Sequence, residues 1–388
     1  MAAGRHCPPW ADLWPELVGL ILGRLPLADR VRMGAACRPW RRRAARQEPL
    51  PPPLPWLSLL DGAFLSVPGG EIHRRVPLPD DASCYGSMGD WLLLKRSSGG
   101  GTFSLVNPFT KSVVRVPKEA FPPGPLITVK PVLLSTLDLS PNSSSPFAIL
   151  TIEDDPSLES VISVCRPGTA TPTAFRGPDG DAIFDVAFFD GKLHALSHSK
   201  LYVLDDLETG SSARVPSMRC VADVVDNKPR VVWRTIAGER RVSAYVSSYL
   251  VESSGKLLHV RRRIEYPITS PEKKVGRGRT LSFQVFEADL TADCSRGKWR
   301  RVDALGGQAL FVGLHSKSLP APECGAWEDC IYFVCDHDYG TCGADPLRDC
   351  GVFDMRTGMI TPLLPDDVVV QQQGCKGHPT WFFPAKTM

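Results

Sequence analysis

The chain has 388 residues, of which 43% are hydrophobic and 22% charged, and this balance is ordinary for a globular protein with a sizeable core. The formal net charge of +3 is too small to predict nucleic-acid binding by the chain as a whole. No apolar run approaches the roughly 18 residues that a spanning helix needs, and residues 1–9, expected to be disordered, lack the apolar core of a secretory signal. We therefore expect a protein of the cytoplasm, the nucleus or both, with reduced thiols and no membrane contact.

Residues 10–47 are predicted to form a module of three short helices. In the first helix, Leu17 and Ile21 stand at helical spacing. Pro26 ends this helix, and Pro39 separates a second helix from a third. So small a module buries little apolar area and is marginal by itself. Its apolar stripe is wider than one core needs, so part of the stripe is expected to face a partner.

The order of apolar, proline and aromatic positions in this module resembles an F-box. The matching positions read Leu13-x-Pro15-Glu16-Leu17, Ile21-Leu22-x-x-Leu25-Pro26 and Cys37-Arg38-x-Trp40-Arg41. Trp14 stands where the family usually has proline, and Pro39 where it often has serine. The resemblance implies binding to a Skp-type adaptor and, through it, to a cullin. The adaptor-binding residues that it implies are Leu13, Pro15, Glu16, Leu17, Ile21, Leu22, Leu25, Pro26, Val31, Cys37 and Trp40. The alternative is a helical cap that covers the next domain.

Two basic stretches have no clear role in this scheme. The third helix carries Arg38, Arg41, Arg42, Arg43 and Arg46, which fit a nuclear-import signal, a phosphate-binding patch or an ordinary solvated face. The second stretch holds Lys273, Lys274, Arg277 and Arg279, and the glycines between its arginines predict a flexible loop. The solvated interpretation is the simpler one for both.

Residues 48–55 are rich in proline and are predicted to form a stiff, extended linker. Helical periodicity is absent from residues 56–384, which are predicted to be all-β. The clearest unit lies at 183–216, where a strand, an Asp190-Gly191 hairpin turn and two further strands are followed by a short strand at 213–215.

Similar meanders recur at 91–116, 256–302 and 331–363, and weaker copies lie at 55–80 and 126–178. Irregular repeats of a four-stranded unit predict a β-propeller of about six kelch-like blades. The C-terminal Trp381-Phe382-Phe383 segment is a candidate for closing the ring. A pair of β-sandwiches is the alternative.

The whole chain resembles the plant F-box proteins that carry a C-terminal KIB-type β-propeller of undefined function. The resemblance rests on Trp91-Leu92-Leu93, Asn107-Pro108-Phe109-Thr110, Asp190-Gly191-Lys192-Leu193, and Val352-Phe353-Asp354 with Thr357-Gly358. It implies a receptor for a protein substrate and does not name that substrate.

Motifs for catalysis are absent from the sequence. It has no Gly-x-Ser-x-Gly elbow and no His-Glu-x-x-His pair, and the glycines at 99–101 lack the lysine of a phosphate-binding loop. His194 is predicted to be a structural or rim residue. Zinc is an alternative for one cluster, in which ordinary reduced thiols are expected instead: Cys324, Cys330, Cys335, His337, Cys342 and Cys350.

The sequence therefore predicts the substrate-recognition subunit of an SCF-type (Skp–cullin–F-box) ubiquitin ligase, with no catalytic residue, cofactor or metal of its own. Nucleic acid is not expected as a partner. One alternative is an F-box and propeller scaffold that is not coupled to degradation. The other is a propeller enzyme, whose chemistry would lie in the central channel.

Overall fold

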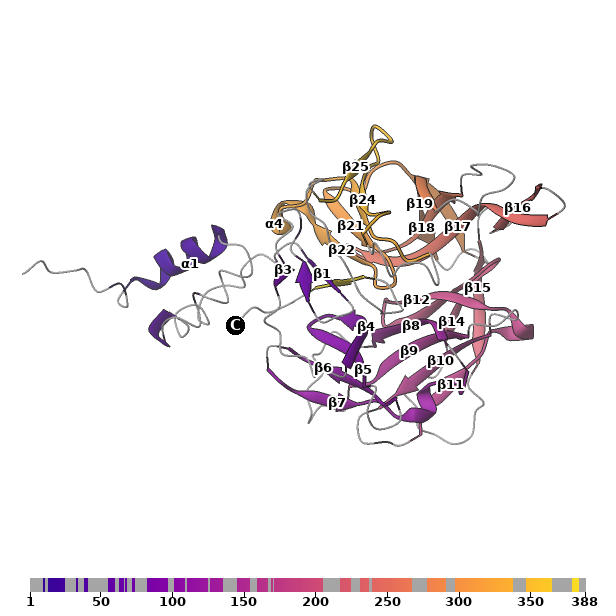
Figure 1. Ribbon diagram of the computed structural model, residues 1–388, viewed down its shortest axis with the longest axis horizontal. Coiled ribbons are helices and arrows are strands. Elements are labelled where there is room, and N and C mark those ends of the chain that lie inside the picture. Colours follow the sequence, from indigo (N-terminus) through magenta and orange to yellow (C-terminus); the bar gives the residue numbers. More distant parts are fainter. Residues whose placement is uncertain are drawn as a thin grey trace, which may run out of the picture.

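The computed structural model shows a ring of β-sheets and, beside it, a short helix near the N-terminus (Figure 1). The helix is α1 (Pro15–Arg24). The structure describes residues 10, 13–24, 33, 38–40, 55–59, 63–65, 67, 72–73, 82–96, 101–108, 110–124, 126–134, 145–153, 159–166, 169, 171–204, 217–224, 231–236, 239–266, 278–290, 297–337, 347–364 and 379–383.

The first three blades each have four strands. The first combines β26 (Thr380–Phe382), β1 (Trp56–Ser58), β2 (Phe64–Leu65) and β3 (Ile72–His73) in that order. The second is β4 (Ala82–Met88), β5 (Trp91–Arg96), β6 (Phe103–Val106) and β7 (Val113–Arg115). The third is β8 (Leu126–Leu133), β9 (Phe147–Glu153), β10 (Ser160–Cys165) and β11 (Thr173–Phe175).

The last two blades each have a fifth strand. The fourth blade is β12 (Ile183–Phe189), β13 (Lys192–Ser197), β14 (Lys200–Leu204) and β15 (Met218–Asp223). The fifth is β16 (Val231–Ile236), β17 (Glu239–Ser253), β18 (Lys256–Glu265), β19 (Arg279–Asp289) and β20 (Lys298–Val302). The sixth is β22 (Lys317–Pro320), β21 (Gln308–Val312), β23 (Cys330–Phe333), β24 (Gly351–Asp354) and β25 (Ile360–Pro362). A short helix, α4 (Ala321–Cys324), links β22 to β23.

One strand of each blade lies at the centre of the ring. Going round, β26 lies beside β4, β4 beside β8, β8 beside β12, β12 beside β17, and β17 beside β22. The six sheets therefore radiate from a common axis as a six-bladed β-propeller, which confirms the predicted architecture. The alternative of two β-sandwiches is wrong.

Local turn chemistry explains several of the hairpins. Asp190 and Gly191 have φ angles of 48° and 70°, and Ser254 and Gly255 have φ angles of 49° and 75°. Two successive residues with positive φ make the type of two-residue turn whose twist matches paired strands. These turns join β12 to β13 and β17 to β18, as the sequence predicts.

The fourth blade corrects one predicted strand. The strand that pairs with β14 is β15, with Leu204 opposite Met218, whereas the sequence placed it at 213–215. Those residues lie outside the described part of the chain.

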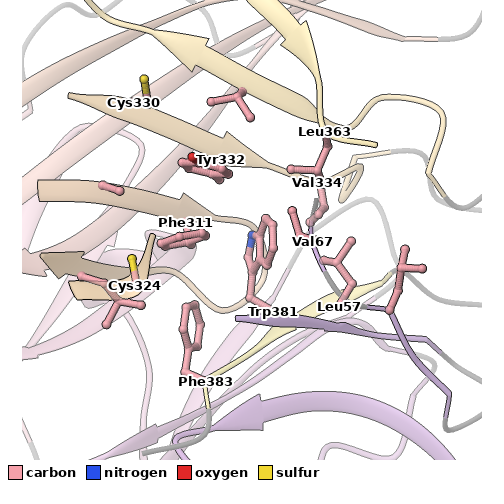
Figure 2. Packing of buried hydrophobic residues seen from close by; sticks show 14 of the residues in the cluster. Leu57, Val67, Phe311, Cys324, Cys330, Tyr332, Val334, Leu363, Trp381 and Phe383 are labelled. Carbon is pink, nitrogen blue, oxygen red and sulfur yellow. The ribbon is translucent and has the colours of Figure 1, made fainter. Parts of the chain in front are cut away.

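The ring closes between the two ends of the propeller. Strand β26 pairs with β1, with Leu57 opposite Trp381, so C-terminal and N-terminal strands share the first blade. Figure 2 shows Trp381 between Phe311 of the sixth blade and the side chains of the first. The indole Nε1 of Trp381 donates a hydrogen bond to the carbonyl of Val312 at 3.0 Å. The predicted closure by the C-terminal aromatic segment is therefore confirmed.

The N-terminal module is described only in part. Beyond α1, Met33 and residues 38–40 are helical, so the three-helix F-box stays a prediction. Residues 1–9, the linker at 48–54, four of the five arginines near the third predicted helix, and the basic residues at 273–277 lie outside the described part of the chain.

Candidate functional site

Helix α1 and Trp14, the residue directly before it, expose an apolar arc. The exposed fractions are 73% for Trp14, 46% for Leu17, 61% for Leu20 and 39% for Ile21. At 3.6 residues per turn these four side chains span about 120° of the helix surface. In a helix that packs only against the core of its own domain, the residues that face solvent are usually polar. The arc is therefore an apolar surface that no described part of the chain covers.

The neighbouring face of α1 is buried. Val18 and Leu22 are both 0% exposed, and their four-residue spacing places them on one side of the helix. Leu22, an implied adaptor-binding residue, therefore contributes to packing within the chain. Glu16, in the first turn, is exposed and suits the positive N-terminal end of the helix.

The other implied adaptor-binding residues divide into two groups. Leu13 and Pro15 are partly buried, and the indole of Trp40 donates a hydrogen bond to the carbonyl of Trp10 at 2.7 Å. This bond holds the segment around Trp40 against the start of the module. Outside the described part of the chain lie Leu25, Pro26, Val31 and Cys37.

A buried ion pair joins three inner strands of the propeller. Lys130 on β8 donates to Asp185 on β12, and both side chains are buried. The backbone N–H of Leu250 on β17 donates to the other carboxylate oxygen of Asp185 at 2.7 Å. Burial raises the pKa of the Asp185 carboxyl, while Lys130 and two backbone N–H groups oppose that rise. Every oxygen of this carboxylate already accepts a hydrogen bond, which suits a role in fastening blades.

His315 lies near this ion pair. It is buried in the connection between β21 and β22, and a side chain added at Gly86 of β4 would overlap its ring. Burial, together with the charge of Lys130, lowers the pKa of His315 to about 3. Neither ring nitrogen has a hydrogen-bond partner among the described residues. The sequence analysis did not predict that Lys130, Asp185 and His315 lie together. A signal was present, because a single charged residue in an otherwise apolar strand, such as Lys130 in β8 or Asp185 in β12, indicates a buried partner of opposite charge.

A second buried network joins the fifth and sixth blades. The guanidinium of Arg262 on β18 is fully buried, and its Nη1 donates to the Val334 carbonyl at 2.7 Å and to Asp336 at 3.1 Å. Its Nη2 donates to Asp349 at 2.8 Å. Thr280 on β19 also donates to Asp349, at 2.7 Å from its hydroxyl. Arg262 of the fifth blade thus forms ion pairs with two carboxylates of the sixth blade.

The cysteine-rich segment contributes mainly to packing. Cys324, Cys330 and Cys335 are buried and form no disulfide, and Cys350 is partly buried. Burial raises the pKa of Cys330 to about 11, which disfavours the thiolate that binds metal. Within the described ranges, no three His, Cys, Asp or Glu side chains lie together as a metal site would require. Cys342 lies outside those ranges. His194, on β13, is buried and packs edge-on against Phe189.

Three loops meet at one end of the sixth blade. The carboxylate of Asp329 accepts hydrogen bonds from the Leu305 N–H at 2.6 Å and from Arg356 Nη2 at 2.8 Å. Burial opposes the charge of Asp329, but these donors outweigh it and lower the pKa. Trp327 and Met359, in two of the loops, are exposed. Tryptophan, methionine and arginine are enriched at protein interfaces, so this end of the blade is a second exposed candidate surface.

Comparison with known proteins agrees with the closed ring of six sheets. The family model described as KIB1-4 beta-propeller matches residues 64–354. Because this match covers well over half of the sequence, the chain belongs to the KIB1-4 β-propeller family. The chain is also similar to F-box protein At4g12382 of Arabidopsis thaliana, with 26% identity over 124 residues, which are 29% of this chain and 83% of that protein. Among the described residues, no helix is long and apolar enough to cross a membrane.

Proposed function

We propose that this chain is the substrate-recognition subunit of an SCF-type ubiquitin ligase. The N-terminal helical module binds a Skp-type adaptor, which connects it to a cullin. The propeller holds a target protein, and other subunits transfer ubiquitin. The chain itself performs no chemistry and needs no cofactor. It accelerates transfer by raising the effective concentration of target lysines near the transfer enzyme, in the cytoplasm, the nucleus or both.

The apolar arc of α1 carries this proposal. Leu17, Leu20 and Ile21 are large, apolar and substantially exposed on a helix outside the propeller ring (Figure 1). Buried apolar anchors of this kind can each contribute about 2 kcal/mol or more to an interface. The name of the similar Arabidopsis thaliana protein, an F-box protein, supports the same assignment.

Co-purification with a plant Skp-type adaptor tests the proposal. The full chain is expected to form a complex, and Leu17→Asp combined with Ile21→Asp is expected to weaken it at least about tenfold, because each change buries a charge in the interface. The matched control is Met359→Asp with Ile360→Asp, which alters two exposed apolar residues of the propeller. If the wild-type chain does not bind the adaptor, the proposal is wrong. If both variants bind as well as wild type, the interface has been assigned to the wrong residues.

A scaffold without a role in degradation is the second candidate. The lifetimes of proteins captured by the propeller distinguish it from a ligase subunit. Partners should be longer-lived in cells that carry the Leu17→Asp, Ile21→Asp chain than in cells that carry wild type. Equal lifetimes, together with intact adaptor binding by wild type, would favour the scaffold.

A further inference from the structure

The fifth blade carries an arm that extends beyond its sheet. Strand β18 begins to pair with β17 at Ala244, opposite Glu265. The preceding residues 239–242 pair only with β16, at positions 233–236. At about 3.3 Å per residue, these four pairs carry the hairpin roughly 13 Å past the blade. Figure 1 shows β16 at the periphery of the molecule, away from the other blades.

The outer edge of the arm is a strand edge. Within the part of the chain that the structure describes, β16 pairs with β17 and with no other strand. An edge strand presents backbone N–H and C=O groups that an extended peptide can pair with. Residues 231–236 contain no proline, so every residue of this edge keeps its backbone donor.

The charge of this region differs in sign from the rest of the chain. Residues 230–280 contain 12 lysines and arginines against 4 acidic residues, whereas the remaining residues contain 33 against 38. The positive charge of the protein is therefore concentrated in this stretch of the sequence. Part of it is used internally, since Arg262 is buried against two carboxylates.

The arm itself keeps an excess of positive charge. Register places Arg234 opposite Arg241, and Arg240 opposite Thr235, while Glu239 is its one acidic residue. A negatively charged partner would complement this excess of positive charge. At the base of the arm, the exposed Arg263 stands between two uncharged residues of the neighbouring strands.

We propose that the arm, formed by β16 and residues 239–245 of β17, binds an extended acidic segment of the target protein, which adds as a strand to the outer edge of β16. This rests on the proposed role as a substrate receptor. A strand edge fits a peptide backbone and offers nothing specific to a nucleic acid or a membrane. The net negative charge of the remaining chain also disfavours a large polyanion.

Fluorescence anisotropy with the purified full chain tests this inference. The probe is a labelled peptide of alternating Glu and Val, compared with an alternating Glu-Pro peptide of equal length and charge. The Glu-Val peptide should bind, and more weakly as salt is raised. The Glu-Pro peptide should bind at least about tenfold more weakly, because proline cannot donate to a strand ladder. Equal binding of the two peptides would overturn strand addition.

Charge reversal locates the site. Arg234→Glu with Arg241→Glu should weaken Glu-Val binding at least about tenfold, in keeping with loss of paired charges. The control, Lys298→Glu with Arg300→Glu on the outer strand β20 of the same blade, should change it less than about twofold. Unchanged binding by the arm variant, or tighter binding through the arm of a single-stranded oligonucleotide or of phosphatidylserine vesicles, would overturn the inference. The arm variant should still co-purify with the adaptor, so a failure here is distinct from a failure of the proposed function.

Discussion

Asp349 of the sixth blade accepts a hydrogen bond from Nη2 of Arg262 in the fifth, at 2.8 Å, and the arginine side chain is fully buried. The two residues are 87 positions apart in the sequence. The same guanidinium lies over the ring of Phe333, with 4.8 Å between its central carbon and the ring centroid. The boundary between these blades therefore combines a charged network with an aromatic contact, and it does not rely on apolar burial alone.

Replacing Arg262 by methionine should lower the free energy of unfolding by about 3–5 kcal/mol, the usual cost of removing one member of a buried ion pair. The change leaves Asp336 and Asp349 buried without their counter-charge. Urea unfolding followed by tryptophan fluorescence measures the shift. The control Arg300→Met removes an exposed pair with Glu287 and should cost at most about 1 kcal/mol. Equal losses in the two variants would contradict a special role for the buried pair.

The elements of the fold that depend on neighbouring residues could be predicted from the sequence. Asp190-Gly191 and Ser254-Gly255 set their hairpins through backbone conformation alone. The repetition of such turns then implied repeated blades. The exposed position of Leu17 and Ile21 also followed from local spacing, because the apolar stripe of α1 is wider than one buried face.

The features that depend on distant residues could not be predicted. Lys130 and Asp185 are 55 residues apart, and Asp185 and Leu250 are 65 apart. Turn chemistry and periodicity carry no information about which inner strands become neighbours. Strands β16, β21 and β22 were also missed, because all three precede the meanders expected at 256–302 and 331–363. In the sixth blade β21 pairs with β23 in parallel, and hairpin turns do not signal a parallel pairing.

Trp381 should be the most important single side chain for ring closure. It is fully buried between the first and sixth blades and hydrogen-bonded to Val312 (Figure 2). Trp381→Ala should lower the free energy of unfolding by about 3–5 kcal/mol, through lost contacts and the cavity that remains. Trp327→Ala removes an exposed indole of the same size and should change stability by no more than about 0.5 kcal/mol. Thermal and urea unfolding of both variants test the difference, and a similar small effect for both would show that the closure does not depend on Trp381.

Because His259 is buried in the fifth blade, we expect the protein to lose stability in mild acid. Burial lowers the pKa of His259 to about 3, and in an unfolded chain it is about 6.5. Below pH 6.5 the unfolded state therefore takes up a proton that the folded state excludes. The resulting loss is about 2 kcal/mol at pH 5. His259→Gln should show a correspondingly shallower fall in unfolding free energy between pH 7 and pH 5, in urea titrations at each pH. His198→Gln alters an exposed histidine and should keep the wild-type slope; the same slope in His259→Gln would contradict the prediction.

The two faces of α1 should respond differently to the same substitution. Val18 is fully buried, and Val18→Asp places an unpaired charge in the interior of the helical module, which should unfold that module because the cost is several kcal/mol. Leu17 is nearly half exposed, and Leu17→Asp should leave the helix folded while weakening adaptor binding. Limited proteolysis between the helix and the propeller separates the two effects: rapid cleavage is expected for Val18→Asp and wild-type resistance for Leu17→Asp. The two substituted positions are adjacent in the sequence, so each variant is the control for the other. If both variants are cleaved faster than wild type, Leu17 belongs to the core of the module, and the adaptor-binding surface would then consist of Leu20 and Trp14.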